Sequence, residues 1–324
     1  MRRILPAVGL FFLAPLIAEY LLGDLPITML GALAVLAPMY GGGALLIREI
    51  TRRFGRGWPT IFALALAYAI VEEAFLDQTL FNPNYLGLNL HLLEHGYIPA
   101  LGIGAWWTVF VLTLHTVWSI STSIALAEAL APDRSTTPWL GRIGLAVASV
   151  LFLLGAGAVT LISIRQDHSH FMASVPQFIS AGVIAMTLIA AAFRLPRTAA
   201  PILAGTVPNP WLVGAAALAA GSLFLVVPPD WGWWAFAACL ALDLGAIVAI
   251  WAWSRHSGWN GSHRLALAAG AVLAYAWHAF VQTPVVPGTA GSTRIGNAVF
   301  ALGAVILISC AARKLPVNAD FVGE

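Results

Sequence analysis

Long apolar runs, separated by short polar stretches, make up almost the whole chain. About 20 apolar residues in a helix cross the ~30 Å hydrocarbon core of a bilayer, and backbone polar groups in lipid have to be satisfied within the helix. The pattern therefore predicts an all-α fold, a polytopic transmembrane helix bundle of about ten spans. The predicted spans are residues 5–22, 27–47, 58–81, 101–130, 143–164, 172–193, 211–227, 231–253, 265–283 and 295–312.

Basic residues between the runs predict the orientation. If the N-terminus is inside, every one of the 16 Lys and Arg residues except Arg165 and Arg294 falls on the cytoplasmic side. Cytoplasmic loops collect Lys and Arg, so this bias predicts a multi-pass protein of the cell membrane with both termini in the cytoplasm. No gap between runs is long enough for a soluble domain, and residues 1–324 are expected to form a single integral membrane domain.

The beginning of the chain has two interpretations. Arg2 and Arg3 followed by an apolar run resemble a secretory signal, but the run is longer than the usual ~7 to 15 residues, which favours a retained first span.

Composition narrows the classes of function. With 60% hydrophobic and 9% charged residues, the chain is expected to have membrane lipid as its partner, and a net charge of +2 gives no reason to expect nucleic acid. Cys239 and Cys310 both lie inside apolar runs, which excludes a disulfide framework and a thiolate zinc cluster. The glycine run 41–43 is expected to allow close helix packing. The sequence leaves the oligomeric state open.

Ionisable residues inside the predicted spans are the candidates for chemistry. A charge in the hydrocarbon costs at least ~2.5 to 3.5 kcal/mol, so such groups normally face the bundle interior and mark function. We expect most of them to meet in one water-filled cavity that opens outward, while the partner of Asp243 is not predicted. Glu49 and Glu128, beside arginines near the cytoplasmic interface, are expected to be solvated and structural. The intramembrane group is Glu19, Glu72, Glu73, Asp77, His115, Asp243 and His278.

Three functions are compatible with this group. Two histidines with two or three carboxylates are ligand types of a divalent metal such as zinc, with one carboxylate left as general base. This hypothesis is a metal-dependent intramembrane hydrolase, in which Glu72 and Glu73 are catalytic and His115 and His278 bind the metal. The alternatives are a proton- or cation-coupled transporter that uses the same carboxylates, and a non-enzymatic scaffold or accessory subunit whose buried hydrogen bonds orient the helices.

Three short motifs resemble those of the CAAX-protease and bacteriocin-processing (CPBP) family of intramembrane metalloproteases. That family's EExxxR motif matches at Glu72 and Glu73, with Asp77 in place of the arginine. Its FxxxH motif matches at His115, with Phe110 one position early, and its third motif matches at His278, with Gln282 in place of Asn. The resemblance implies that one glutamate activates water while the other glutamate and both histidines bind metal or the transition state. It implies a hydrophobic peptide or a small molecule as the substrate.

Overall fold

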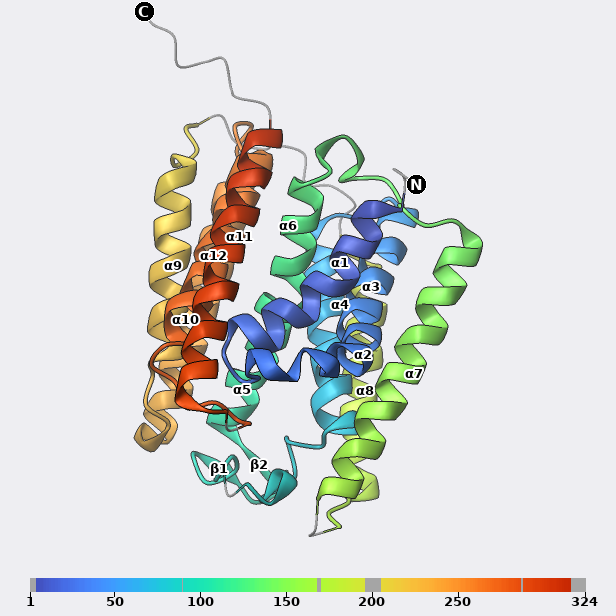
Figure 1. Cartoon of the computed structure of the whole chain (residues 1–324), viewed down its shortest axis with the longest axis vertical. Helices are drawn as coiled ribbons and strands as arrows, with labels where there is room; N and C mark the ends of the chain where they lie inside the picture. Colours follow the sequence, from blue (N-terminus) through green and yellow to red (C-terminus); the bar gives the residue numbers. More distant parts are fainter. Residues whose placement is uncertain (1–3, 89, 168–169, 196–204, 287, 316–324) are drawn as a thin grey trace, which may run out of the picture.

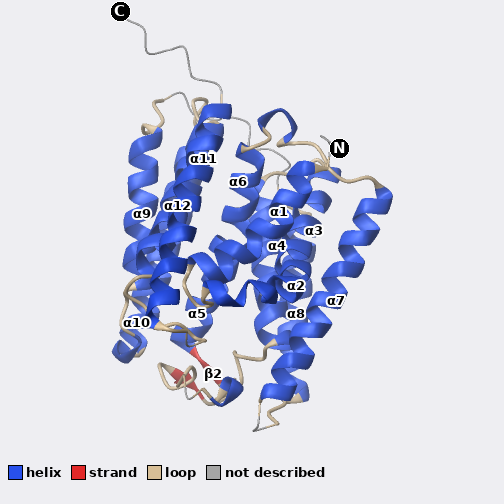
Figure 2. Ribbon diagram, viewed as in Figure 1, coloured by secondary structure: helices blue, strands red, loops and turns tan. Residues whose placement is uncertain are grey.

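The computed structural model describes residues 4–88, 90–167, 170–195, 205–286 and 288–315, and within them the chain forms a bundle of ten helices (Figures 1 and 2). The all-α expectation is confirmed. The described strands are two short ones, β1 (Tyr97–Ile98) and β2 (Ile103–Gly104), which pair antiparallel in the loop before the fourth helix.

The first four helices are interrupted by 3₁₀ or π segments, whereas the last six are continuous. The interrupted helices are α1 (Leu5–Pro15) with η1 (Leu16–Leu21); η2 (Ile27–Ala32), α2 (Leu33–Leu36), η3 (Ala37–Gly41) and α3 (Gly42–Arg53); α4 (Trp58–Val71) with η4 (Glu72–Leu76); and α5 (Ala105–Thr113), η6 (Leu114–Thr122) and α6 (Ser123–Ala129). The continuous helices are α7 (Arg142–Gln166), α8 (Val175–Ala192), α9 (Pro210–Leu225), α10 (Trp233–Ser254), α11 (Gly261–His278) and α12 (Ala290–Lys314). Short 3₁₀ turns are η5 (Tyr85–Gly87), η7 (Pro132–Arg134) and η8 (Pro229–Trp231).

Local signals place the helix ends more accurately than hydropathy does. Helix α11 begins four residues before the predicted span 265–283, because Asn260 and His263 form a capping box there. The third helix ends at Leu76 instead of residue 81, because Gln78 adopts a left-handed backbone conformation with φ of 58° that no helix continues.

Helix α5–η6–α6 lies between the two halves of the bundle (Figure 1). On one side it packs into a core with α9 to α12, through Trp118 and Tyr275. On the other side Ile120 and Ile124 join a core with α1, α3 and α4. The central helix therefore contacts both halves of the bundle and fixes their positions relative to each other.

Burial separates inner from outer helices. In the apolar window of α4–η4, 67% of residues are buried inside the protein, against 11% in α10, so α10 presents most of its surface to lipid. Seven of the described helices are long and apolar enough to cross a membrane, while Leu5–Leu21 and Pro210–Leu225 are apolar but shorter. The exact number of crossings therefore stays a prediction.

The beginning of α1 and the end of α12 lie at the same end of the bundle (Figure 1). That arrangement agrees with an even number of crossings. The cytoplasmic assignment of this end stays a prediction, and Arg2, Arg3 and Arg197, three of the basic residues behind it, lie outside the described residues.

Candidate functional site

Three of the predicted site residues meet inside the bundle. Glu72 and Glu73 come from η4 and His115 from η6, and one ligand atom from each lies within 4.8 Å of the others. All three are buried, with Glu72 fully inaccessible. These residues, together with Glu19 and Tyr40 described below, are called the carboxylate cluster.

His115 stands between the two glutamates with one ring nitrogen toward each. Its Nε2 lies 2.6 Å from Glu73 Oε1, a hydrogen-bond distance, and its Nδ1 lies 3.1 Å from Glu72 Oε2. Ser119, one turn along the helix, lies 3.2 Å from the same Nδ1. The imidazole is therefore placed to exchange a proton with Glu73 and to carry its positive charge beside Glu72.

The two glutamates differ in how they are satisfied. Glu73 interacts through Oε1 with His115, and its Oε2 accepts a hydrogen bond from the Thr79 hydroxyl, which itself accepts one from the indole N–H of Trp107 at 3.1 Å. Among the described residues, no donor is aligned with either oxygen of Glu72: His115 Nδ1 and the hydroxyls of Tyr40 and Tyr68 lie beside it without hydrogen-bond geometry. A buried polar group without a partner costs about 1 to 3 kcal/mol, so Glu72 is the less satisfied member.

Glu19 joins the cluster through a tyrosine. The hydroxyl of Tyr40 donates to Glu19 Oε1 at 2.7 Å, and the Tyr40 ring stacks on the His115 ring with centroids 5.9 Å apart. The Tyr68 ring lies 6.4 Å from that of Tyr40. A third carboxylate and two phenols therefore surround the Glu72 side of the imidazole.

Each residue of the cluster lies in a π-helical segment. Glu19 is in η1, Tyr40 in η3, the two glutamates in η4 and His115 in η6, and these are the π-helical segments of the described chain. Wide π turns are rare and are frequently found at functional sites, because the extra residue in the turn re-aims side chains at the cost of regular hydrogen bonding. Four helices carry this distortion at the one place where their polar side chains meet.

Glycines in the second helix allow this convergence. A Cβ on Gly41 would lie 1.9 Å from the carbonyl oxygen of Phe11, and a Cβ on Gly43 would lie 2.4 Å from the Tyr68 ring. Helix α1 and the Tyr68 side chain could not approach so closely with any larger residue. The prediction that the glycine run serves close packing is confirmed.

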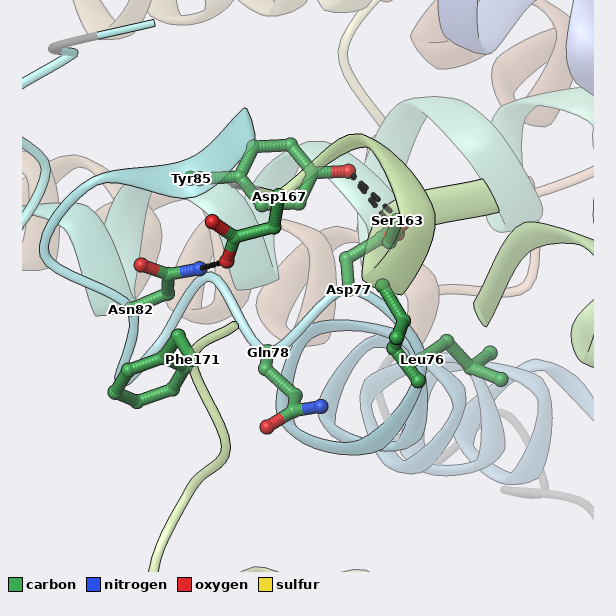
Figure 3. A pocket seen from close by; sticks show the side chains of 9 residues that line it. Leu76, Asp77, Gln78, Asn82, Tyr85, Ser163, Asp167 and Phe171 are labelled. Atoms are coloured by element: carbon green, nitrogen blue, oxygen red, sulfur yellow. Dashed lines mark hydrogen bonds between the residues drawn. The ribbon is translucent and has the colours of Figure 1, made fainter. Parts of the chain in front are cut away.

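Asp77, four residues after Glu73, lines a small polar chamber (Figure 3). It follows Glu73 at the end of η4, and its Oδ1 accepts hydrogen bonds from Ser163 at 2.7 Å and Tyr85 at 3.1 Å. Asn82 donates to Asp167 at 2.8 Å across the same chamber, where the space open to the centre of a water molecule is about 10 Å³. That space suffices for about one water molecule.

Besides Asp77, two of the predicted residues lie outside the cluster. His278, at the end of α11, is half-buried beside Leu225 and Gln282, and the structure does not bring it to Glu72, Glu73 and His115. Asp243 of α10, which had no partner predicted from the sequence, accepts a hydrogen bond from Thr113 at 2.8 Å. Its role is therefore to join α10 to α5.

The loop after η1 carries another acid near the cluster. Asp24 accepts a hydrogen bond from Gln282 at 2.8 Å, and its backbone carbonyl accepts one from the Val286 N–H at 3.2 Å. Burial and, to a smaller extent, the nearby Glu19 together raise the pKa of Asp24 to about 7. Asp24 thus ties the loop after α11 to the tip of the first helical hairpin.

The donor set of the cluster fits a divalent metal by type, with one imidazole and two carboxylates. Its spacing fits a hydrogen bond better, because a tetrahedral zinc would hold its ligand atoms about 3.4 Å apart, whereas Glu73 and His115 are 2.6 Å apart. Metal binding would require these two side chains to separate, while Glu72, which lacks a donor, could act as a ligand without losing a hydrogen bond.

Sequence reasoning did not identify Tyr40 and Thr79 as members of this site. Neither side chain is ionisable near neutral pH. Neither residue lies three or four positions from Glu72 or Glu73, the spacing that would place it on the same helix face. Tyr40 directly precedes the glycine run, which marks a close helix approach, and this was the one signal that could have indicated it.

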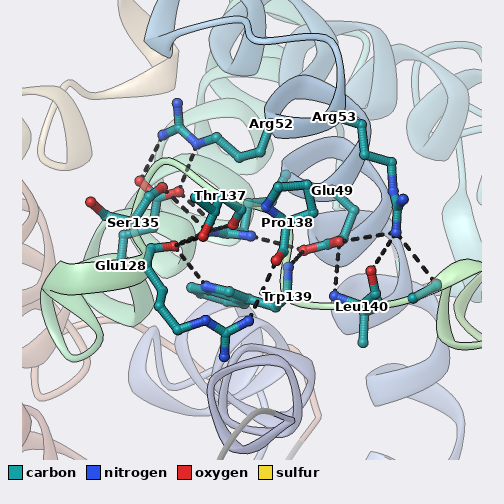
Figure 4. A network of polar contacts seen from close by, with 12 residues as sticks. Glu49, Arg52, Arg53, Glu128, Ser135, Thr137, Pro138, Trp139 and Leu140 are labelled. Carbon is teal, nitrogen blue, oxygen red and sulfur yellow. Dashed lines mark hydrogen bonds and ion pairs between the residues drawn. The ribbon is translucent and has the colours of Figure 1, made fainter.

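A second buried polar group, called here the arginine network, consists of Arg48, Glu49, Arg52 and Glu128 (Figure 4). Arg48 donates to both glutamates, and Arg52 forms a bidentate pair with Glu128 at 2.9 and 2.7 Å. Glu49 and Glu128 are 0% and 5% exposed, so the expectation that they are solvated was wrong.

The arginine network also holds the loop after α6. Arg48 donates to the carbonyl oxygens of Arg134, Ser135 and Thr137 and lies 3.3 Å above the Trp139 ring centroid. Glu49 accepts the backbone N–H groups of Trp139 and Leu140. Arg53, which is partly exposed, adds a contact of 3.6 Å to Glu49. Every buried charge of the network is thus paired with the opposite sign and hydrogen-bonded, as a structural network requires.

Comparison with known proteins identifies the family of the chain but does not indicate an activity. The model of an uncharacterized membrane protein family matches residues 9–315. No curated protein and no solved structure matches the chain.

Proposed function

Because the chain belongs to this uncharacterized family of membrane proteins, we propose its function from the site alone: it is a proton-coupled membrane transporter in which Glu73 and His115 exchange the proton. The observation that carries the proposal is the excess of buried carboxylates around one imidazole in an enclosed, π-helical centre.

The charge of the cluster supports proton binding. Glu19, Glu72, Glu73 and the neighbouring Asp77 face His115, and within the described residues none of these four carboxylates pairs with an Arg or a Lys. Burying an ionised carboxylate without a compensating cation costs several kcal/mol. The cluster is therefore most stable when protons or other cations neutralise most of these carboxylates.

His115 provides the means to move a proton. The imidazolium form donates from Nε2 to Glu73 and places its remaining charge beside Glu72. Transfer of the Nε2 proton to Glu73 Oε1 leaves a neutral imidazole and a neutral carboxylic acid. One short transfer thus removes the positive charge from Glu72.

The enclosure of the site favours small species. Glu72 is fully inaccessible and Glu73 is 3% exposed. A peptide could reach these carboxylates only if helices separated, whereas a proton or a small ion requires far less space. Conversion of a π segment to α-helix shifts the register by one residue, a rotation of about 100°, which could re-aim a glutamate between two sides.

Reconstitution into liposomes tests the proposal. The wild-type protein should dissipate an imposed pH gradient, read from an entrapped pH-sensitive dye, and Glu73→Gln and His115→Asn should abolish the flux. Asp243→Asn, a carboxylate within a helix but outside the cluster, should retain it. Equal flux in wild type and His115→Asn would contradict the proposal.

A metal-dependent intramembrane hydrolase is the second candidate. Two carboxylates and an imidazole with ligand atoms within 4.8 Å favour it, as does the CPBP resemblance at Glu72, Glu73 and His115. These three residues would hold the metal, which would act as a Lewis acid for hydrolysis of a hydrophobic peptide. Purified protein should then contain about one divalent ion per chain, lost in Glu73→Ala and in His115→Ala. A metal-free protein with proton flux would exclude this candidate.

A further inference from the structure

Glu72 presents an unsatisfied carboxylate to an oxygen-rich site. It is 0% exposed, and among the described residues neither of its oxygens has an aligned donor. Glu73, by contrast, interacts with His115 and Thr79. The two adjacent glutamates therefore have different roles, and Glu72 is the one whose oxygens can coordinate a cation.

Two phenol groups border this carboxylate. The Tyr68 hydroxyl lies beside Glu72, is buried and has no aligned partner in the described part of the chain. The Tyr40 hydroxyl also lies beside Glu72, but it donates its single proton to Glu19 at 2.7 Å. A phenol has one proton to donate, so the Tyr40 oxygen can present only a lone pair toward Glu72.

The packing holds these groups in position. Because Gly43 has no side chain, the Tyr68 ring occupies space that a Cβ would enter at 2.4 Å. Tyr40 is fixed by stacking on His115 and by its hydrogen bond to Glu19. The Glu72 carboxylate and the phenol oxygens of Tyr40 and Tyr68 are thus neighbours on side chains that packing holds in place.

We propose that Glu72, Tyr40 and Tyr68 bind a monovalent metal cation of the Na⁺ class. This inference rests on the proposed proton-coupled function and names the ion that exchanges for the proton. Carboxylate and hydroxyl oxygens are hard ligands that suit hard cations, and membrane transporters coordinate Na⁺ through oxygen atoms of the protein. The Glu72 carboxylate carries one negative charge, which one positive charge neutralises, and this favours a monovalent ion over a divalent one.

His115 couples the two ions. Its Nδ1 lies 3.1 Å from Glu72 Oε2, so an imidazolium there occupies the same electrostatic position as the bound cation. Two positive charges beside one carboxylate repel each other in a low-dielectric site. The imidazolium and the bound cation therefore compete for the Glu72 carboxylate, and each weakens the binding of the other by the same factor.

Cation binding to the purified, full-length protein in detergent tests this inference. NaCl, compared with N-methyl-D-glucamine chloride at equal ionic strength, should raise the thermal midpoint with saturation and release protons into a weakly buffered solution. Glu72→Gln should abolish both effects. Tyr68→Phe should weaken the apparent affinity by about tenfold, the loss of one ligand worth about 1.4 kcal/mol.

Asp243→Asn is the matched control and should respond to Na⁺ as wild type does, because its carboxylate is bound by Thr113 away from the cluster. If Tyr68→Phe does not fold, Glu72→Gln carries the test. Equal responses to the two salts, with the wild-type proton flux intact, would overturn the cation site and leave the proposed function standing. Absence of both the Na⁺ response and the flux would overturn both. Saturable stabilisation by Zn²⁺ and none by Na⁺ would replace the inference with the metal centre of the hydrolase.

Discussion

The arginine network and the carboxylate cluster share two helices and differ in geometry and in charge. The network lies on α3 and α6, where these helices are regular. The cluster takes Tyr40 from η3 and His115 from η6 of the same two helices, and its glutamates from η1 and η4, and all four segments are π-helical. In the network two arginines face two glutamates and the loop carbonyls accept the remaining donors. In the cluster one histidine faces three glutamates, and Glu72 has no donor.

This contrast separates structure from function. Balanced and fully hydrogen-bonded charges gain nothing from a change of protonation, so they rigidify the place where they lie. An excess of buried negative charge destabilises the cluster, and an incoming cation removes that destabilisation. Substitutions in the two groups should consequently have opposite consequences for stability and for activity.

The largest effect on stability is expected at Glu128. Glu128→Gln removes the carboxylate shared by Arg48 and Arg52. The buried Arg52 then lacks its counter-charge and Arg48 keeps only Glu49, which should cost about 3 to 5 kcal/mol. Reversible unfolding in mixed detergent micelles measures the loss. Glu94→Gln is the control, because that side chain is 66% exposed and should leave stability unchanged. A stable Glu128→Gln protein would mean that the network is not structural.

His115 and Glu73 should behave as one unit. Each single substitution, His115→Asn or Glu73→Gln, is expected to destabilise the protein by about 1 to 3 kcal/mol, because it leaves the other partner buried without its hydrogen bond. The double variant should lose less than the sum of the two. A double-mutant cycle on unfolding free energies gives the coupling, and strictly additive losses would show that the two side chains do not interact.

Gly43→Ala should disturb the cluster through packing alone. The new Cβ would lie 2.4 Å from the Tyr68 ring, and overpacking of this kind costs about 1 to 3 kcal/mol. The control is Gly157→Ala, at an exposed site of α7 where a Cβ meets nothing within 4 Å. Thermal midpoints of the two variants provide the comparison, and an equal midpoint for both would mean that Tyr68 is not held tightly.

The smallest effect on stability is expected at Glu72. Glu72→Gln removes a buried carboxylate that lacks a donor, so the free energy of unfolding should stay unchanged or rise by about 1 kcal/mol. Proton flux should nevertheless be lost, since the charge that faces His115 is gone. A fall in stability as large as that of Glu128→Gln would contradict the distinction between a structural arginine network and a functional carboxylate cluster.

Hydropathy predicted the ten helices because lipid imposes a simple length and polarity rule on every span. It predicted the convergence of Glu72, Glu73 and His115 for the same reason, since their charges have to leave the lipid. It placed the third helix end too late, because the left-handed Gln78 is a backbone property that hydropathy does not contain.

Other parts of the site depend on packing between distant segments. Tyr40 enters the cluster through a close approach that Gly41 permits, and His278 stays outside it because α11 ends beside Leu225. Asp243 finds Thr113 across a helix interface. Composition and spacing along one helix carry no information on which face of another helix lies opposite, so these contacts required the structure.

Infrared spectroscopy of the carboxyl groups tests the central claim most directly. The C=O stretch of protonated carboxylic acids, recorded for wild type and Glu73→Gln in detergent over a range of pH, reports whether the cluster holds exchangeable protons. We expect wild type to show a protonated-carboxyl band that Glu73→Gln lacks and that disappears as the pH is raised. Identical spectra for the two proteins at every pH would contradict proton exchange at Glu73.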